Sequence, residues 1–76
     1  MFEQLKELIL NYVEVDEEKV TPEARFMEDL GFTSFDFMSM LGEIEEEFDI
    51  EIDNEHAEHI TTVSDAVEEI KNALNA

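Results

Sequence analysis

The chain has 76 residues, of which 22 are acidic and 4 are basic, so its formal charge at pH 7 is −18. A chain this short forms one domain at most and leaves much of its surface in water, which argues against an enzyme with a deep, dry pocket. Its negative charge repels nucleic acids and anionic membranes. We therefore expect a single domain over residues 1–76 whose partners carry Lys and Arg patches.

Apolar residues make up 43% of the chain, too many for a disordered acidic tail. There is no cysteine, so any thiol chemistry must come from a group added to the chain. The first 13 residues include Glu3, Lys6 and Glu7, unlike a signal peptide. Since no apolar run could span a bilayer either, we expect a cytoplasmic protein.

The N-terminal segment carries apolar residues at helical spacing. Leu5, Leu8, Ile9 and Tyr12 lie at i, i+3, i+4 and i+7, which predicts a helix over about 3–14. Residues 15–33 lose this period and include turn-forming Pro and Gly. We expect an ordered loop there, held to the core by four apolar residues, Val15, Val20, Phe26 and Leu30.

A second helix is predicted over 34–48. Thr33 can cap it, and Asp36 three residues later approximates a capping box. At 100° per residue, the apolar residues of this segment form one stripe that can face a core. The stripe consists of Phe37, Met40, Leu41, Ile44 and Phe48.

The C-terminal third begins with an ambiguous segment. Residues 48–52 alternate as a strand would, but a lone strand has no partner, so we expect a connection with buried isoleucines. Residues 54–59 can make a short helical turn after Asp53 or Asn54. A last helix should follow Thr62, with Asp65 as the acid of its capping box and an apolar stripe of Val63, Ala66, Val67, Ile70 and Leu74.

Ser34 stands where the long loop becomes the second helix. A serine there is most often a cap, but Thr33 can do the capping and leave the Ser34 hydroxyl free. A phosphodiester on that oxygen would lie at the positive end of the helix dipole, beside unpaired N–H groups. The sequence places no histidine–acid pair nearby to activate it. We interpret Ser34 as an attachment point.

Phe35 and Met38 lie off the core stripe, at the same end of the helix as Ser34. One interpretation is that they cover an edge of the core or are ordinary exposed apolar residues. The other is that they form an apolar patch, rimmed by carboxylates, for a partner with a basic rim. The residues alone leave both open.

Three blocks of the sequence together resemble the acyl carrier protein family. They are Asp29-Leu30-Gly31 followed by Ser34 and Asp36, residues 44–52, and residues 57–63, in the family's order and spacing. The resemblance implies an all-α fold, a small four-helix bundle with three long helices, one short helix and a long ordered loop between the first two. It also implies a monomeric carrier without catalytic activity.

By this resemblance, Ser34 receives 4'-phosphopantetheine from coenzyme A through a phosphopantetheinyl transferase of the holo-acyl-carrier-protein synthase type. The thiol of that arm would account for the missing cysteine, because acyl groups ride on it as thioesters. The implied role is to shuttle acyl intermediates between enzymes of fatty acid or related, polyketide-type biosynthesis.

The resemblance also assigns the sides of the second helix. The side that meets basic surfaces of acyl-processing enzymes would include Phe35, Asp36, Met38, Glu45 and Glu46. The acyl chain can fold back between the helices in this family, and the candidate lining residues are Phe37, Met40, Leu41 and Ile44.

Four positions depart from the family pattern or from helix preference. Thr33 and Phe35 stand where Asp and Leu are usual, and Ser39 where a glutamate is common. Gly42 lies inside the helix, on the partner side, at a cost of roughly 1 kcal/mol relative to alanine. These departures leave open which transferase modifies the chain.

Three other hypotheses remain at this stage. The chain could be a dedicated carrier for an amino acid or another specialised acyl group, or an acidic interaction module that carries nothing. His56 and His59, at i and i+3, could bind a transition metal, although exposed histidines are more often solvated. A calcium loop over residues 49–60 fails at its sixth and twelfth positions. We expect no metal site.

Overall fold

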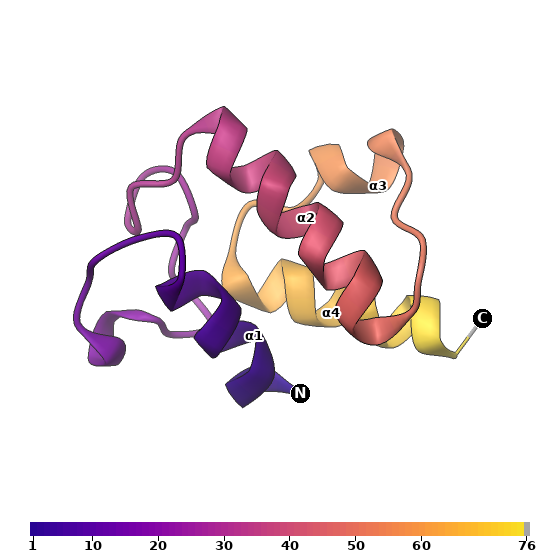
Figure 1. Cartoon of the computed structure of the whole chain (residues 1–76), viewed down its shortest axis with the longest axis horizontal. Coiled ribbons are helices and arrows are strands. Elements are labelled where there is room, and N and C mark those ends of the chain that lie inside the picture. Colours follow the sequence, from indigo (N-terminus) through magenta and orange to yellow (C-terminus); the bar gives the residue numbers. More distant parts are fainter. Residues whose placement is uncertain (76) are drawn as a thin grey trace.

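The computed structural model describes residues 1–75, and Figure 1 shows a small bundle of helices. The helices are α1 (Phe2–Leu10), α2 (Ser34–Phe48), α3 (Asn54–Glu58) and α4 (Val63–Leu74). A single 3₁₀ turn, η1 (Glu17–Lys19), which the sequence pattern did not predict, lies in the first loop. No strand occurs in the described part of the chain, so the all-α prediction is confirmed.

One hydrophobic core joins α1, α2 and α4. The α2 stripe that periodicity predicted is buried, except that Phe48 is only half-buried at the end of the helix. The fully or nearly fully buried residues of the three helices are Leu5, Ile9, Phe37, Met40, Leu41, Ile44, Val63, Ala66 and Ile70. The predicted α4 stripe fades toward its end, where Leu74 is exposed.

The first helix is shorter than its pattern predicted, since α1 ends at Leu10 and not near residue 14. The Tyr12 N–H donates to the Ile9 carbonyl, three residues back, which tightens the chain into a turn. The Tyr12 side chain then donates its phenolic hydrogen to Glu43 on α2. This contact joins the turn after α1 to α2, and periodicity cannot indicate it.

The loop between α1 and α2 is ordered, as predicted. Val20, Phe26 and Leu30 are buried in the core, and Val15 is half-buried. Backbone hydrogen bonds also join this loop to the start of α4, from Phe26 N to Thr61 O (3.0 Å) and from Val63 N to Ala24 O (3.0 Å). Residues 24–26 of the loop are therefore joined to the segment that opens α4.

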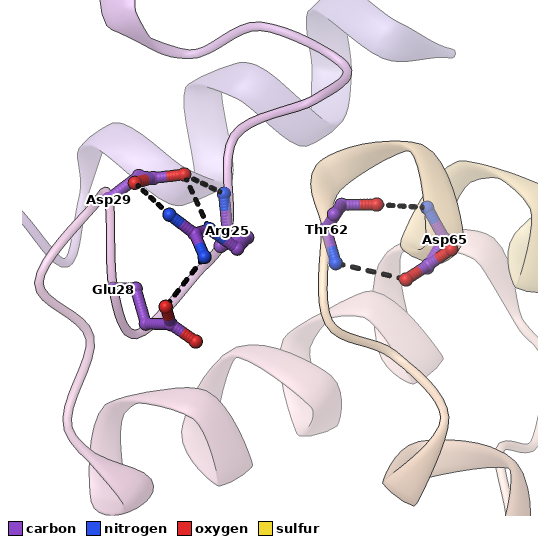
Figure 2. Close-up of polar contacts among 5 residues, drawn as sticks. All are labelled: Arg25, Glu28, Asp29, Thr62 and Asp65. Atoms are coloured by element: carbon purple, nitrogen blue, oxygen red, sulfur yellow. Dashed lines mark hydrogen bonds and ion pairs between the residues drawn. The ribbon is translucent and has the colours of Figure 1, made fainter.

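The predicted helix caps are present in all three later helices. Thr33 and Asp36 form a complete capping box at α2, and Thr62 and Asp65 form another at α4 (Figure 2). The Asp53 side chain accepts the N–H of His56 and so caps α3. The expected connection between α2 and α3 contains no strand, although its isoleucines are half-buried and not buried.

Candidate functional site

Ser34 is exposed and is the first residue of α2. The capping is done by Thr33, whose Oγ1 accepts the Asp36 N–H at 3.1 Å, while Asp36 Oδ2 accepts the Thr33 N–H at 3.4 Å. Within residues 1–75, the Ser34 hydroxyl forms no hydrogen bond. Its oxygen is therefore free for a covalent modification.

The backbone beside this hydroxyl can accommodate a phosphate. The first N–H groups of α2, those of Ser34 and Phe35, have no acceptor among the described residues. Unpaired N–H groups at a helix N-terminus, together with the helix dipole, favour a negatively charged group there. The residues present thus fit a phosphodiester on Ser34.

The loop before Ser34 is shaped by Gly31 and Arg25. Gly31 has a φ of 80°, a conformation that a side chain would strain. Arg25 donates to Glu28 (2.6 Å) and to Asp29 through Nε (3.1 Å), as Figure 2 shows. The hydrogen bond from Arg25 lowers the pKa of Asp29 below its usual value. Two carboxylates near the start of α2 are therefore already partnered.

Two large apolar side chains are exposed on α2 next to Ser34. Phe35 is 79% exposed and Met38 is 58% exposed. Neither covers an edge of the core, while their exposure agrees both with ordinary exposed apolar residues and with an apolar patch for a partner. They form an apolar surface one turn long beside the free hydroxyl.

The acidic residues of α2 differ in what they do. Asp36 belongs to the capping box, and the Glu45 carboxylate accepts the N–H of Ile52 at 2.9 Å, which holds the connection after α2. Glu43 accepts the Tyr12 hydroxyl. Glu46 is exposed and has no hydrogen-bonding or ionic partner within residues 1–75. Of the predicted partner-binding acids, Glu46 is the one fully available to another molecule.

A cleft of about 300 Å³ lies between the loop of residues 25–28, the first turn of α2 and the α3 region. Its apolar lining includes Phe26, Phe37, Ala57 and Ile60. Of the four predicted acyl-lining residues, only Phe37 borders this cleft. Met40, Leu41 and Ile44 are buried in the core and do not line it.

The two histidines lie near α4 but belong to no metal-binding cluster among the described residues. His56 Nδ1 is 2.8 Å from Asp53 Oδ1 and 3.8 Å from Glu69 Oε1. Across residues 1–75, no group of three or more His, Asp or Glu side chains could hold a metal ion. These contacts give His56 a structural role at the start of α3.

No helix in the described part of the chain has both the length and the apolar character needed to cross a membrane.

Comparison with known proteins identifies the group that fits Ser34. The family model described as a phosphopantetheine attachment site matches residues 3–70. Over all 76 residues the chain is 43% identical to an acyl carrier protein of Phenylobacterium zucineum (strain HLK1), of which it covers 96%. The chain belongs to the acyl carrier protein family. It is therefore a carrier and not a catalyst, and its cofactor is covalently attached 4'-phosphopantetheine.

Family membership also implies the general kinds of partner. An acyl carrier protein must interact with a phosphopantetheinyl transferase and with acyl-processing enzymes. The family assignment removes the basis for an acidic module that carries nothing. Which acyl groups this carrier transports is not fixed by family membership.

Several residues that shape the site escaped sequence analysis. The Tyr12–Glu43 contact joins residues 31 positions apart, and the Glu45–Ile52 contact spans the end of α2; neither follows a helical period, so no sequence signal indicates them. Arg25 has a partial signal, since Asp29 stands four residues later and opposite charges at that spacing often pair in a helical turn.

Proposed function

We propose that this carrier holds acyl intermediates as thioesters on a 4'-phosphopantetheine arm attached to Ser34. The observation that carries the proposal is the free, exposed hydroxyl of Ser34 beside unpaired N–H groups, since Thr33 does the capping. The arm supplies a thiol, which the chain lacks. A transferase would move the phosphopantetheinyl group from coenzyme A to Ser34 Oγ. The Oγ–P bond forms as the pyrophosphate bond of coenzyme A breaks, adenosine 3',5'-bisphosphate leaves, and the hydroxyl proton is released.

The charged surface supports transient docking in the fatty acid or a related acyl pathway. We propose that Phe35, Met38 and Glu46 contact partners directly, while Asp36 and Glu45 add negative charge and keep the helix and the following loop in place. Exposed ion pairs are individually weak and screened by salt, which suits fast exchange between enzymes. The same acidic surface repels anionic membranes, which supports a cytoplasmic carrier. It also repels other copies of the chain, which supports a monomer.

The cleft between the 25–28 loop and α3 supports a route for the acyl chain. We propose that a chain on the arm enters past Phe37 and, when long, opens the core over Met40, Leu41 and Ile44. Methionine suits such a lining because its side chain is flexible and adapts to different shapes. A volume of about 300 Å³ is at the lower end of the range for small-molecule sites.

The test is intact mass after incubation with coenzyme A, Mg²⁺ and a broad-specificity phosphopantetheinyl transferase. We expect a gain of one phosphopantetheinyl group on the wild type and none on Ser34→Ala. Ser39→Ala and Ser64→Ala are matched controls, because they remove the chain's other two serines. Modification of Ser34→Ala, or no modification of the folded wild type, would contradict the proposal.

A further inference from the structure

Two aromatic rings in contact form part of the wall of the cleft between the 25–28 loop and α3. Phe26 and Phe37 both border this cleft, and their ring centroids lie 5.6 Å apart. Phe26 is fully buried, and Phe37 is nearly so. Met40 and Ile44 do not border the cleft. A group that enters it therefore meets the two rings and not the core residues of α2.

Further aromatic contacts hold Phe26 in place. Its ring packs edge-on against that of Phe32, with 5.4 Å between the centroids, and the Phe32 ring lies 6.0 Å from that of Tyr12. Tyr12 in turn donates its phenolic hydrogen to Glu43 of α2. Because interior side chains are closely packed, displacing Phe26 would disturb this whole series of contacts.

Phe37 has more freedom than Phe26. It lies three residues after Ser34, which is about one helical turn. Besides the cleft, it borders a second hollow of about 290 Å³, together with Met38, Asn54 and Ala57. The ring of Phe37 therefore has space beside it, which makes it the part of the wall that can move.

The volume of the cleft sets the size of what can enter. A cavity of about 150 Å³ can hold one benzene molecule. On this scale, a cleft of about 300 Å³ holds about twelve carbon-sized atoms. The sulfur and methylenes at the end of the arm, with the thioester oxygen, take roughly four of these positions and leave about eight for acyl carbons.

We propose that Phe37 limits the acyl chains that this carrier holds away from water to about eight carbons. A chain of that length fills the cleft while the contact between Phe26 and Phe37 stays intact. A longer chain leaves its end in water or parts the two rings, and either outcome offsets the gain from the added methylene groups. This inference rests on the proposed attachment of the arm to Ser34.

The experiment loads the chain with straight acyl groups from butanoyl to hexadecanoyl, using acyl-coenzyme A and the broad-specificity transferase. Circular dichroism measures Tm, which should rise by at least ~4 °C from butanoyl to octanoyl, the effect of burying one or two further methylene groups. Tm should rise no further with dodecanoyl or hexadecanoyl. Cleavage of the thioester by hydroxylamine is a second readout and should be slowest for octanoyl.

Three changes to leucine test the position of this limit. Phe37→Leu removes one ring of the wall, so Tm should continue to rise up to dodecanoyl. Ala57→Leu narrows the cleft from the α3 side, so the rise should stop before octanoyl. The matched control, Phe48→Leu, changes a half-buried phenylalanine at the other end of α2 that does not border the cleft, and it should keep the wild-type limit. Each variant is compared with its own butanoyl form, so that differences in baseline stability cancel.

A Tm that continues to rise through hexadecanoyl in the wild type would overturn the inference. An unchanged limit in both Phe37→Leu and Ala57→Leu would do the same, as would an equal shift in Phe48→Leu. If the transferase loads no acyl group onto the folded wild type, the carrier proposal at Ser34 fails and this inference fails with it. If the loaded wild type shows no limit, the carrier proposal stands and only the role of Phe37 is wrong.

Discussion

At the scale of single residues, the acids of α2 have separable roles. Glu45 accepts the N–H of Ile52, whereas Glu46 is exposed and unpaired within residues 1–75. A change at Glu45 therefore alters both the charge of the surface and the connection after α2. A change at Glu46 alters the charge alone, which makes Glu46 the cleaner probe of docking.

We expect Glu46→Lys to raise KM for acyl-processing enzymes by roughly three- to tenfold, the scale of one or two weak charge pairs. Its Tm should remain within a few degrees of the wild type. Glu68→Lys, an equal charge reversal at an exposed position of α4, is the control. Enzyme kinetics on the loaded carrier provide the measurement, and equal effects of the two reversals would show that net charge matters and position does not.

At the scale of elements, one hydrogen bond joins the turn after α1 to α2. Tyr12 donates to Glu43, and its ring lies 6.0 Å from that of Phe32, two residues before Ser34. The hydrogen bond to Glu43, with smaller contributions from burial and nearby carboxylates, raises the pKa of Tyr12 to about 12. The phenol thus stays protonated in the folded state at a pH where an unfolded tyrosine ionises.

This pKa predicts a loss of stability at high pH. A folded pKa above the unfolded value of ~10 means that the stabilisation is complete below pH ~10 and is lost as the pH rises toward 12. Below pH 10, Tyr12→Phe should lower the free energy of unfolding by about 1 kcal/mol. Urea unfolding from pH 8 to 12 should show this difference shrinking above pH 10. A difference independent of pH would contradict the role given to the hydrogen bond.

At the scale of the whole molecule, the net charge of −18 acts across the entire fold. The molecule measures 33 × 22 × 19 Å. The Debye length is ~30 Å at 0.01 M salt and ~8 Å at 0.15 M. At low salt, acidic residues on opposite sides of the molecule therefore repel one another. At the higher salt concentration, only neighbouring charges interact.

We therefore expect Tm to rise when NaCl increases from about 0.01 M to about 0.15 M. A gain of about 1 kcal/mol would appear as a rise of ~4–8 °C for a domain of this size. Thermal unfolding followed by circular dichroism provides the measurement. A doubly charge-reversed variant, Glu7→Lys with Glu68→Lys, should show a smaller rise, and an unchanged or lower Tm of the wild type would refute the repulsion argument.

The sequence alone was sufficient for the helices that combine a strong period with a strong cap. The positions of Thr33 and Thr62 predicted the starts of α2 and α4, because the side-chain hydrogen bonds of a cap reach only three residues along the chain. The prediction that Ser34 keeps a free hydroxyl had the same local basis. The predicted end of α1 near residue 14 was wrong, and the contact that Tyr12 makes there, with a residue 31 positions away, is one that no local pattern indicates.

What only the tertiary structure decided is the outward face of α2. Periodicity identified which residues of α2 face the core, because burial repeats along the chain. It left the burial of Phe35 and Met38 undecided, and it could not separate Glu45 from Glu46. Those distinctions depend on whether atoms from distant segments fill the space beside each residue, and only the folded molecule brings such segments together.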